Sequence, residues 1–347
     1  MRNKRHSIKD IAKKLEVSPT TVSFVLNGKG KEKKISDEVI DRVLTYTKAI
    51  NYKPNMLARS LRTGRTKILV VMVEDISNYF FSRIARYIED IAYEKGYRVL
   101  FCSNENDDKR SRDLLNLFYE RQVDGFIIIP STGIRDDIEE LINNDIPVVL
   151  FDRYFTDLDT HYVVIDNYAA SKEATRHLID NGYRNIAFIC TEVQQLQMLD
   201  RKRGYVDTVT DEGLPATVLE IPFGDTDSAA GRELLRKFFT EQTDLDAVYF
   251  STNYLTCSGL EVIREINSLS IGEIGIVTFD DNDLFRINTP TISAVAQPME
   301  EIAQELMRIV LDLLKQKKKP SETIQVTLPA RLIPRGSSLP KVKTEKV

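Results

Sequence analysis

The sequence of 347 residues has only three cysteines and three histidines, and it lacks any long apolar run. Cys102, Cys190 and Cys257 are far apart, and no CxxC or Cys/His cluster occurs, so we expect free thiols rather than disulfides or a zinc site. No apolar run approaches the length of a membrane span, and no apolar signal segment follows the basic N-terminus. We therefore expect a cytoplasmic protein without a metal or other cofactor.

The usual enzyme signatures are missing as well. No G-x-G-x-x-G follows a predicted strand, and neither G-x-x-x-x-G-K-[ST] nor G-x-S-x-G occurs. His6 belongs to the basic N-terminal segment, and His177 lies on a predicted helix that looks packed or solvated. The adjacent Asp280 and Asp281 would point apart at a strand end, which disfavours joint acid–base catalysis. These absences argue against an enzyme.

Charge is unevenly distributed, although the formal net charge is only −4. Residues 1–67 contain 17 lysines and arginines but 6 aspartates and glutamates, so acidic residues predominate in the rest of the chain. A basic segment on an acidic body is typical of a protein that binds nucleic acid through one domain. The length suits two or three domains.

Residues 7–27 predict two short helices joined by a tight turn. Ser7 and Ser18 occupy helix-capping positions, and Pro19 is suited to the first position of the second helix. Apolar residues recur at helical spacing in both helices, which favours their packing together. The side chains that we expect to contact DNA from this pair are Ser7, Pro19, Thr20, Thr21, Ser23, Phe24 and Asn27. The alternative is an ordinary helical hairpin with solvated polar residues.

A third helix is predicted from Ser36 onward. Asn55 would then cap a short helical segment that contains Ala58 and Leu61 and ends at Gly64. DIAKKLEVSPTTVSFVLNG and NYKPNMLARSLRTGRT together resemble the lactose-repressor (LacI/GalR) family of bacterial transcription regulators.

The resemblance implies how these segments meet DNA. Thr20 and Thr21 would lie on a recognition helix in the major groove. A hinge helix over residues 55–62 would lie in the minor groove, where Leu61 inserts between base pairs. The DNA contacts that it adds are Tyr52, Asn55, Ala58, Arg59, Leu61 and Arg62. Phe24 departs from the family, in which many members carry arginine, so either a contact is lost or an apolar contact replaces it.

After Lys67, short apolar strands alternate with amphipathic helices. This alternation predicts α/β architecture, with parallel sheets covered by helices on both faces. It runs from ILVVMV to PVVLF and again from YVVI to IGIVTF, which indicates two doubly wound halves. Ligands of such folds bind beyond the carboxyl ends of the strands, so we expect a site in the cleft between the halves.

The resemblance continues through this body, which is similar to periplasmic binding proteins, to about Ser337. It implies a helix-turn-helix domain over residues 1–53, a hinge over 54–66, a core over 67–337 and a flexible tail over 338–347. Within the core we expect an N-subdomain of residues 67–164 with 293–322 and a C-subdomain of residues 165–292 with 323–337. The tail lacks a leucine heptad, which favours a homodimer over a tetramer.

Polar and aromatic side chains at the predicted strand ends form the candidate effector site. Carboxylates and guanidinium groups bind sugar hydroxyls, and an aromatic ring covers a sugar or stacks on a base. The candidates are Phe80, Phe81, Asp152, Arg153, Asp166, Arg201, Asn253, Asp280, Asp281 and Gln297. The resemblance makes Arg201 the effector-binding arginine, and Thr252-Asn253 replaces the Asn-Asp usual in the family. Asn167, Asn253 and Asp281 could each be a helix N-cap instead.

The combined expectation is a transcriptional regulator, usually a repressor in this family, that binds a pseudo-palindromic DNA operator as a homodimer. A small metabolite, expected to be a carbohydrate or sugar derivative, would control operator affinity allosterically. The alternatives are control by a protein partner, by a nucleobase or by a sugar phosphate, a sugar-binding module without a regulatory role, and an enzyme on a binding-protein fold. The expected location is the bacterial cytoplasm, at the nucleoid, without a membrane partner.

Overall fold

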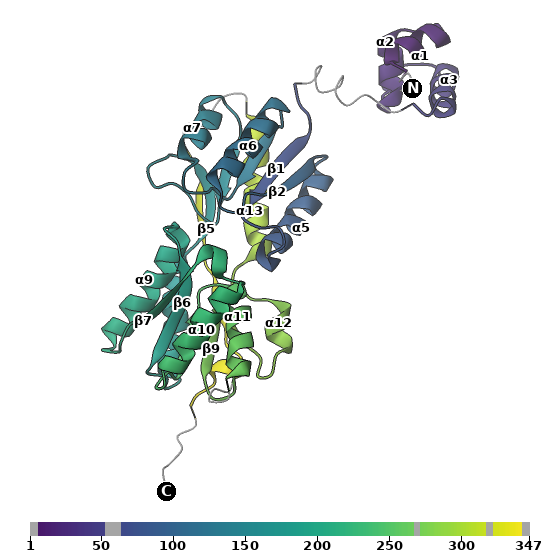
Figure 1. Ribbon diagram of the computed structural model, residues 1–347. Helices are drawn as coiled ribbons and strands as arrows, with labels where there is room; N and C mark the ends of the chain where they lie inside the picture. Colours follow the sequence, from purple (N-terminus) through teal and green to yellow (C-terminus); the bar gives the residue numbers. More distant parts are fainter. Residues whose placement is uncertain (1–5, 53–63, 267–270, 317–321, 342–347) are drawn as a thin grey trace. The chain divides into compact units, whose positions relative to one another are not determined.

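A computed structural model describes residues 6–52, 64–266, 271–316 and 322–341 of the chain. The chain divides into two compact units, residues 1–66 and residues 67–347 (Figure 1). No helix in the described ranges is long and apolar enough to span a membrane.

The first unit is built from three helices, α1 (Ile8–Leu15), α2 (Pro19–Leu26) and α3 (Asp37–Ala49). Ser7 caps α1 in a reciprocal arrangement with Asp10, and Ser18 caps α2 directly ahead of Pro19. A small core holds the helices together and contains Ile11, Ala12, Val22, Val25 and Val43. The predicted helix pair and its capping residues are thereby confirmed.

The first sheet of the second unit has the strand order β11-β5-β4-β3-β1-β2, and all of its neighbouring strands are parallel. Its strands are β1 (Ile68–Val73), β2 (Arg98–Ser103), β3 (Gly125–Ile128), β4 (Val148–Phe151), β5 (His161–Ile165) and β11 (Gln325–Leu328). Side chains alternate across the sheet. Leu69 and Val71 of β1 therefore pack with α5 (Tyr79–Glu94) and α13 (Met299–Lys315). Val70 and Met72 pack instead with α6 (Asp108–Glu120) and α7 (Arg135–Asn143).

The second sheet has the order β12-β10-β9-β8-β6-β7, with β12 antiparallel to β10. Its strands are β6 (Ile186–Glu192), β7 (Thr217–Pro222), β8 (Ala247–Phe250), β9 (Gly275–Phe279), β10 (Ser293–Ala296) and β12 (Arg331–Ile333). The accompanying helices are α8 (Asn167–Asp180), α9 (Leu196–Asp211), α10 (Ala229–Glu241), α11 (Asn253–Glu265) and the short α12 (Asp283–Ile287). The expected pair of doubly wound α/β halves is therefore present.

The chain crosses between the two sheets at points that differ from those expected. Strand β10 lies in a segment assigned to the N-subdomain but belongs to the second sheet. Strand β11 lies in a segment assigned to the C-subdomain but pairs with β5 of the first sheet. A short apolar strand carries no local signal for its sheet, because tertiary packing decides strand pairing.

The start of the expected flexible tail is bound to the second sheet. Ser338 is buried, and its hydroxyl lies 2.7 Å from Nε2 of His177. The Lys341 amide donates to the Asn181 carbonyl at 3.0 Å, and its ammonium pairs with Asp246. The expectation of a flexible segment is therefore wrong for residues 338–341, whereas residues 342–347 lie outside the described ranges.

Candidate functional site

The first turn of α2 presents small side chains to solvent. Pro19 and Thr20 are exposed, and Thr21 is half-buried. The Ser18 hydroxyl accepts from the Thr21 amide at 3.0 Å and lies 2.8 Å from the Thr21 hydroxyl. Ser7, at the start of α1, is also exposed while it caps that helix. The capping bonds hold the turn that carries the free Thr20 side chain, which is the arrangement a recognition helix needs.

The second half of α2 is less exposed than expected. Ser23 and Phe24 are half-buried, and the Lys33 ammonium lies 5.7 Å from the centroid of the Phe24 ring. Asn27 is exposed and donates to the Ser23 carbonyl at 2.7 Å. Tyr52 is half-buried, and this burial raises the pKa of its hydroxyl. A lysine thus places a positive charge beside the phenylalanine that departs from the family pattern.

The remaining candidate DNA contacts are the hinge residues Asn55, Ala58, Arg59, Leu61 and Arg62. They lie outside the described residues, so the hinge helix stays a prediction.

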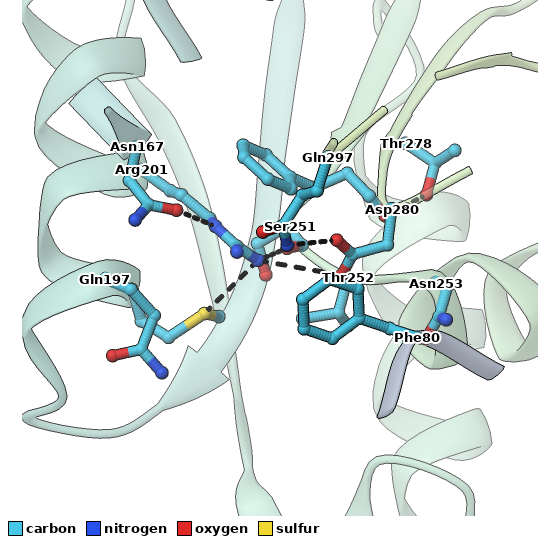
Figure 2. Close-up of polar contacts among 12 residues, drawn as sticks. Phe80, Asn167, Gln197, Arg201, Ser251, Thr252, Asn253, Thr278, Asp280 and Gln297 are labelled. Carbon is cyan, nitrogen blue, oxygen red and sulfur yellow. Dashed lines mark hydrogen bonds and ion pairs between the residues drawn. The ribbon is translucent and has the colours of Figure 1, made fainter. Parts of the chain in front are cut away.

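Arg201 of α9 is the centre of a buried polar cluster beyond the carboxyl ends of the second sheet's strands (Figure 2). Its side chain is 4% exposed. Nε donates to Asn167 and Nη1 donates to the Ser251 carbonyl, each at 2.8 Å. The guanidinium lies 3.6 Å from the centroid of the Phe279 ring. These contacts hold one positive charge in a single orientation away from water.

Asp280 faces Arg201 in this cluster. Its Oδ2 lies 3.9 Å from Arg201 Nη1, and its Oδ1 accepts from Gln297 at 2.6 Å. Burial raises the pKa of Asp280, while Arg201 and the Gln297 hydrogen bond oppose that rise. The carboxylate is therefore oriented by two partners but not neutralised by a close ion pair.

The first sheet contributes a second arginine and two further carboxylates, Glu74 and Asp152. Arg153 is buried and donates through Nη2 to Glu74 at 3.1 Å and to Asn106 at 2.5 Å. Its Nε and Nη1 have no hydrogen-bond partner among the described residues. Asp152 accepts from Gln197 at 3.1 Å. Burial raises the pKa of Asp152 to about 6, although both arginines of the site oppose the rise.

Direct hydrogen bonds join the two sides of the cleft. Asn78, which caps α5, and Asn253, the first residue of α11, exchange amide hydrogen bonds of 3.2 and 3.4 Å. The bond from Gln197 of α9 to Asp152 beyond β4 is a second bridge. A pocket of about 140 Å³ beside the second bridge is lined by Asp152, Tyr154, Val164, Ile165, Asp166, Asn167, Leu196, Gln197, Asp200 and Thr327. Two sets of side-chain hydrogen bonds therefore bridge the cleft, and a small, partly open pocket lies beside the cluster.

The two aromatic candidates, Phe80 and Phe81, lie in the first turn of helix α5. Phe80 and Phe81 are both buried, and their rings meet edge to face with centroids 5.1 Å apart. The Phe80 amide donates to Asn78, which also bonds Asn253, and Figure 2 draws Phe80 within the cluster. Its ring therefore supplies an apolar surface next to the polar groups.

Two residues expected at the effector site have other hydrogen-bond partners. Asp166 is exposed, and its carboxylate accepts from the Ala169 amide and caps α8. Asp281 makes two hydrogen bonds to Arg335, at 2.8 and 2.7 Å. The Asp281 carboxylate is therefore held by Arg335, and effector binding by Asp281 stays a prediction.

The alternative interpretation of three polar residues as helix caps is wrong. The caps of α8, α11 and α12 are Asp166, Thr252 and Asn282. Each of these caps is adjacent in sequence to the residue that the alternative interpretation named as the cap. Asn167 and Asn253 therefore do not cap a helix, and both belong to the buried cluster.

Several residues of the cluster were not expected from the sequence, namely Glu74, Asn78, Asn106, Gln197 and Ser251. Glu74, Asn78 and Ser251 follow strands β1 and β8 closely, which is the same signal that selected the other candidates. Gln197 lies in the first turn of a helix and could not be distinguished by that signal. Among the described residues, no group of three His, Cys, Asp or Glu side chains could hold a metal ion.

Comparisons with known proteins agree with both units. A family model described as bacterial regulatory proteins, lacI family, matches residues 7–55. A second model, described as periplasmic binding proteins and sugar binding domain of LacI family, matches residues 65–328.

Individual relatives match almost end to end. The transcriptional regulator RegA of Clostridium saccharobutylicum is 31% identical over 96% of this chain and 99% of its own length. The ribose operon repressor of Halalkalibacterium halodurans is 30% identical over 96% of this chain and 97% of its own. The lac repressor dimer, solved with operator and an anti-inducer, shares the fold with a TM-score of 0.84 at 18% identity, over 97% of this chain and 100% of that chain.

Proposed function

Because this chain belongs to the lacI family of bacterial regulatory proteins and is a DNA-binding transcriptional regulator, we propose that a neutral sugar bound between its two sheets controls its operator affinity. The observation that carries the proposal is the buried cluster around Arg201 and Arg153. Buried polar groups are normally hydrogen-bonded. Arg153 has two nitrogens without a partner among the described residues, so a ligand oxygen would satisfy groups that are otherwise left unpaired.

The charge of the site favours a neutral ligand over a sugar phosphate. Glu74, Asp152 and Asp280 face Arg153 and Arg201, so the carboxylates outnumber the guanidinium groups. A phosphate would add negative charge to a site where carboxylates are already desolvated. Sugar hydroxyls both donate to carboxylates and accept from guanidinium groups, so they suit both kinds of partner.

The size of the pockets beside the cluster favours a small sugar. The pocket beside Asp152 has about 140 Å³, and a neighbouring pocket of about 250 Å³ shares Tyr154 and Leu196 with it. Drug-sized ligands occupy roughly 300–1,000 Å³. A monosaccharide fits this scale, and the similar ribose operon repressor makes D-ribose the first probe.

DNA binding is assigned to the first unit. Thr20 at the exposed start of α2 would contact base edges, and Lys33 beside Phe24 would contact phosphate. A homodimer would present two such helices to the half-sites of a pseudo-palindromic operator. The regulator would act in the cytoplasm at the nucleoid on genes of carbohydrate metabolism.

The test measures sugar binding and operator binding on the same full-length protein. Calorimetry with D-ribose, other neutral pentoses and hexoses, and D-ribose 5-phosphate identifies the ligand class. Fluorescence anisotropy on an operator selected from a random DNA library then measures the coupling. We expect a neutral sugar to bind more tightly than its phosphate and to change operator affinity by about 5–150-fold. Tighter binding of the phosphate, or sugar binding without any effect on operator affinity, would contradict the proposal.

A further inference from the structure

The C-terminal segment brings Arg335 against the turn that carries Asp280. We propose that Arg335 is a positioning residue for effector recognition, because it holds Asp281 and thereby sets the direction in which the Asp280 carboxylate points. This inference rests on the proposed function, in which Asp280 contacts the sugar.

The contact between Arg335 and Asp281 is bidentate and buried. Nη1 donates to Oδ1 at 2.8 Å, and Nη2 donates to Oδ2 at 2.7 Å. The two side chains are 13% and 9% exposed. Arg286 of α12 also approaches Asp281, with Nε 3.7 Å from Oδ2. A fork-to-fork pair of this kind fixes the carboxylate in its plane, which a single point charge cannot do.

Asp280 needs such support because its backbone is unusual. Its φ is +69°, in the left-handed region that few non-glycine residues adopt, although aspartate is among those found there. A backbone of this kind persists only where surrounding contacts enforce it. The Asp280 amide donates to the Val295 carbonyl of β10 at 3.0 Å, and the next residue is held by Arg335. Arg335 therefore holds the residue that follows Asp280, and the Asp280 side chain is directed toward Arg201.

Arg335 also binds the segment that leads into β10. Its Nη1 donates to the Ile292 carbonyl at 2.7 Å, and its amide donates to the Ser293 hydroxyl at 2.7 Å. Gln297 follows this strand and donates to Asp280. One arginine thus connects the turn after β9 with the strand that supplies the hydrogen-bond partner of Asp280.

The first test needs no ligand. Amide hydrogen exchange of the full-length protein would compare the wild type with Arg335→Ala, Arg335→Lys and the control Arg331→Ala. Arg331 is an exposed arginine on β12, four residues earlier in the same segment. We expect faster exchange at residues 279–283 in both Arg335 variants and not in the control. Unchanged exchange at these residues in Arg335→Ala would overturn the proposal.

The second test is a double-mutant cycle with D-ribose and the other neutral sugars as probes. Arg335→Ala should weaken sugar affinity by about tenfold in the wild-type background and by much less in the Asp280→Asn background, because coupled residues do not add. Lysine at position 335 should fail to restore affinity, since it cannot form the bidentate pair. Equal losses in both backgrounds would show a merely structural role and overturn the proposal.

The two tests separate the two claims. If no neutral sugar in the panel binds the wild type, the sugar part of the proposed function fails. The hydrogen-exchange result would then still decide whether Arg335 holds the turn that carries Asp280.

Discussion

The two units of the chain place their functional side chains in opposite environments. Thr20 of the first unit is exposed, and the cap at Ser18 that supports it is a contact between residues three positions apart. Arg201 of the second unit is buried, and its partners come from three separate segments of the chain. Function should therefore be separable from stability in the first unit but not in the second.

Replacing Arg201 with alanine should have the largest effect. The substitution removes a buried, hydrogen-bonded charge and leaves Asn167, the Ser251 carbonyl and Asp280 without their partner. Losses of this kind cost about 2–5 kcal/mol, so sugar affinity should fall by roughly two orders of magnitude or more. Calorimetry with D-ribose measures the loss, and thermal unfolding should show lower stability as well.

The matched control for this substitution is Arg203→Ala, on the same helix. Arg203 is exposed and pairs with Asp200 three residues before it. Surface pairs of this type contribute about 0–1 kcal/mol, so both sugar affinity and stability should stay close to those of the wild type. An Arg201→Ala protein that keeps its sugar affinity would remove Arg201 from the site.

Replacing Thr20 with alanine tests the other side of the comparison. The exposed hydroxyl makes no hydrogen bond among the described residues of the first unit, so its removal should leave the free energy of unfolding unchanged to within about 0.5 kcal/mol. Loss of one hydrogen bond to a base or phosphate should weaken operator binding by about 1 kcal/mol. Anisotropy on the selected operator measures the change, and a stability loss without weaker DNA binding would refute the assignment.

Replacing Ser18 with alanine should lower the stability of α2 by about as much as Thr20→Ala weakens operator binding. The Ser18 hydroxyl caps α2 by accepting from the Thr21 amide, and its loss should destabilise the helix by about 1 kcal/mol. Amide exchange at residues 19–26 of the full-length protein should become faster, whereas sugar binding should not change. Thr20→Ala is the control, because it should leave this exchange unaltered.

Local features were predictable from the sequence where the cause is itself local. The caps at Ser7 and Ser18 and the alternation of strands and helices depend on neighbours in the chain, and these predictions are confirmed. The sheet to which β10 and β11 belong depends on packing against distant strands. Neither strand carries that information in its own residues, so both were assigned to the wrong half.

The candidate site shows the same limit at the level of single residues. Asp280 and Asp281 are adjacent and chemically identical, so position after a strand cannot tell them apart. Their difference comes from Arg335, which is 54 residues away from Asp281 in sequence and binds it. Asn78 and Asn253, which bridge the cleft, are 175 residues apart in sequence. Of the two, the sequence predicts only Asn253 as a site residue. Long-range partners therefore decide which strand-end residues form the cluster.

The pH dependence of sugar binding should give the smallest effect, and it distinguishes function from stability at one half-buried residue, Asp152. The pKa of Asp152 is raised to about 6, so lowering the pH from 7.5 to 5.5 protonates the carboxylate and removes an acceptor for sugar hydroxyls. Sugar affinity should fall by a few-fold over this range. Asp152→Asn should abolish this dependence in calorimetric titrations.

The same protonation should move stability in the opposite direction. A carboxyl group whose pKa is higher in the folded state than in the unfolded state, about 3.9, contributes most to stability below that lower value. Its contribution is lost as the pH rises through about 6. Between pH 7.5 and 5.5, Asp152 should therefore favour folding more while binding sugar less. A parallel loss of stability and affinity that persists in Asp152→Asn would instead indicate general acid unfolding.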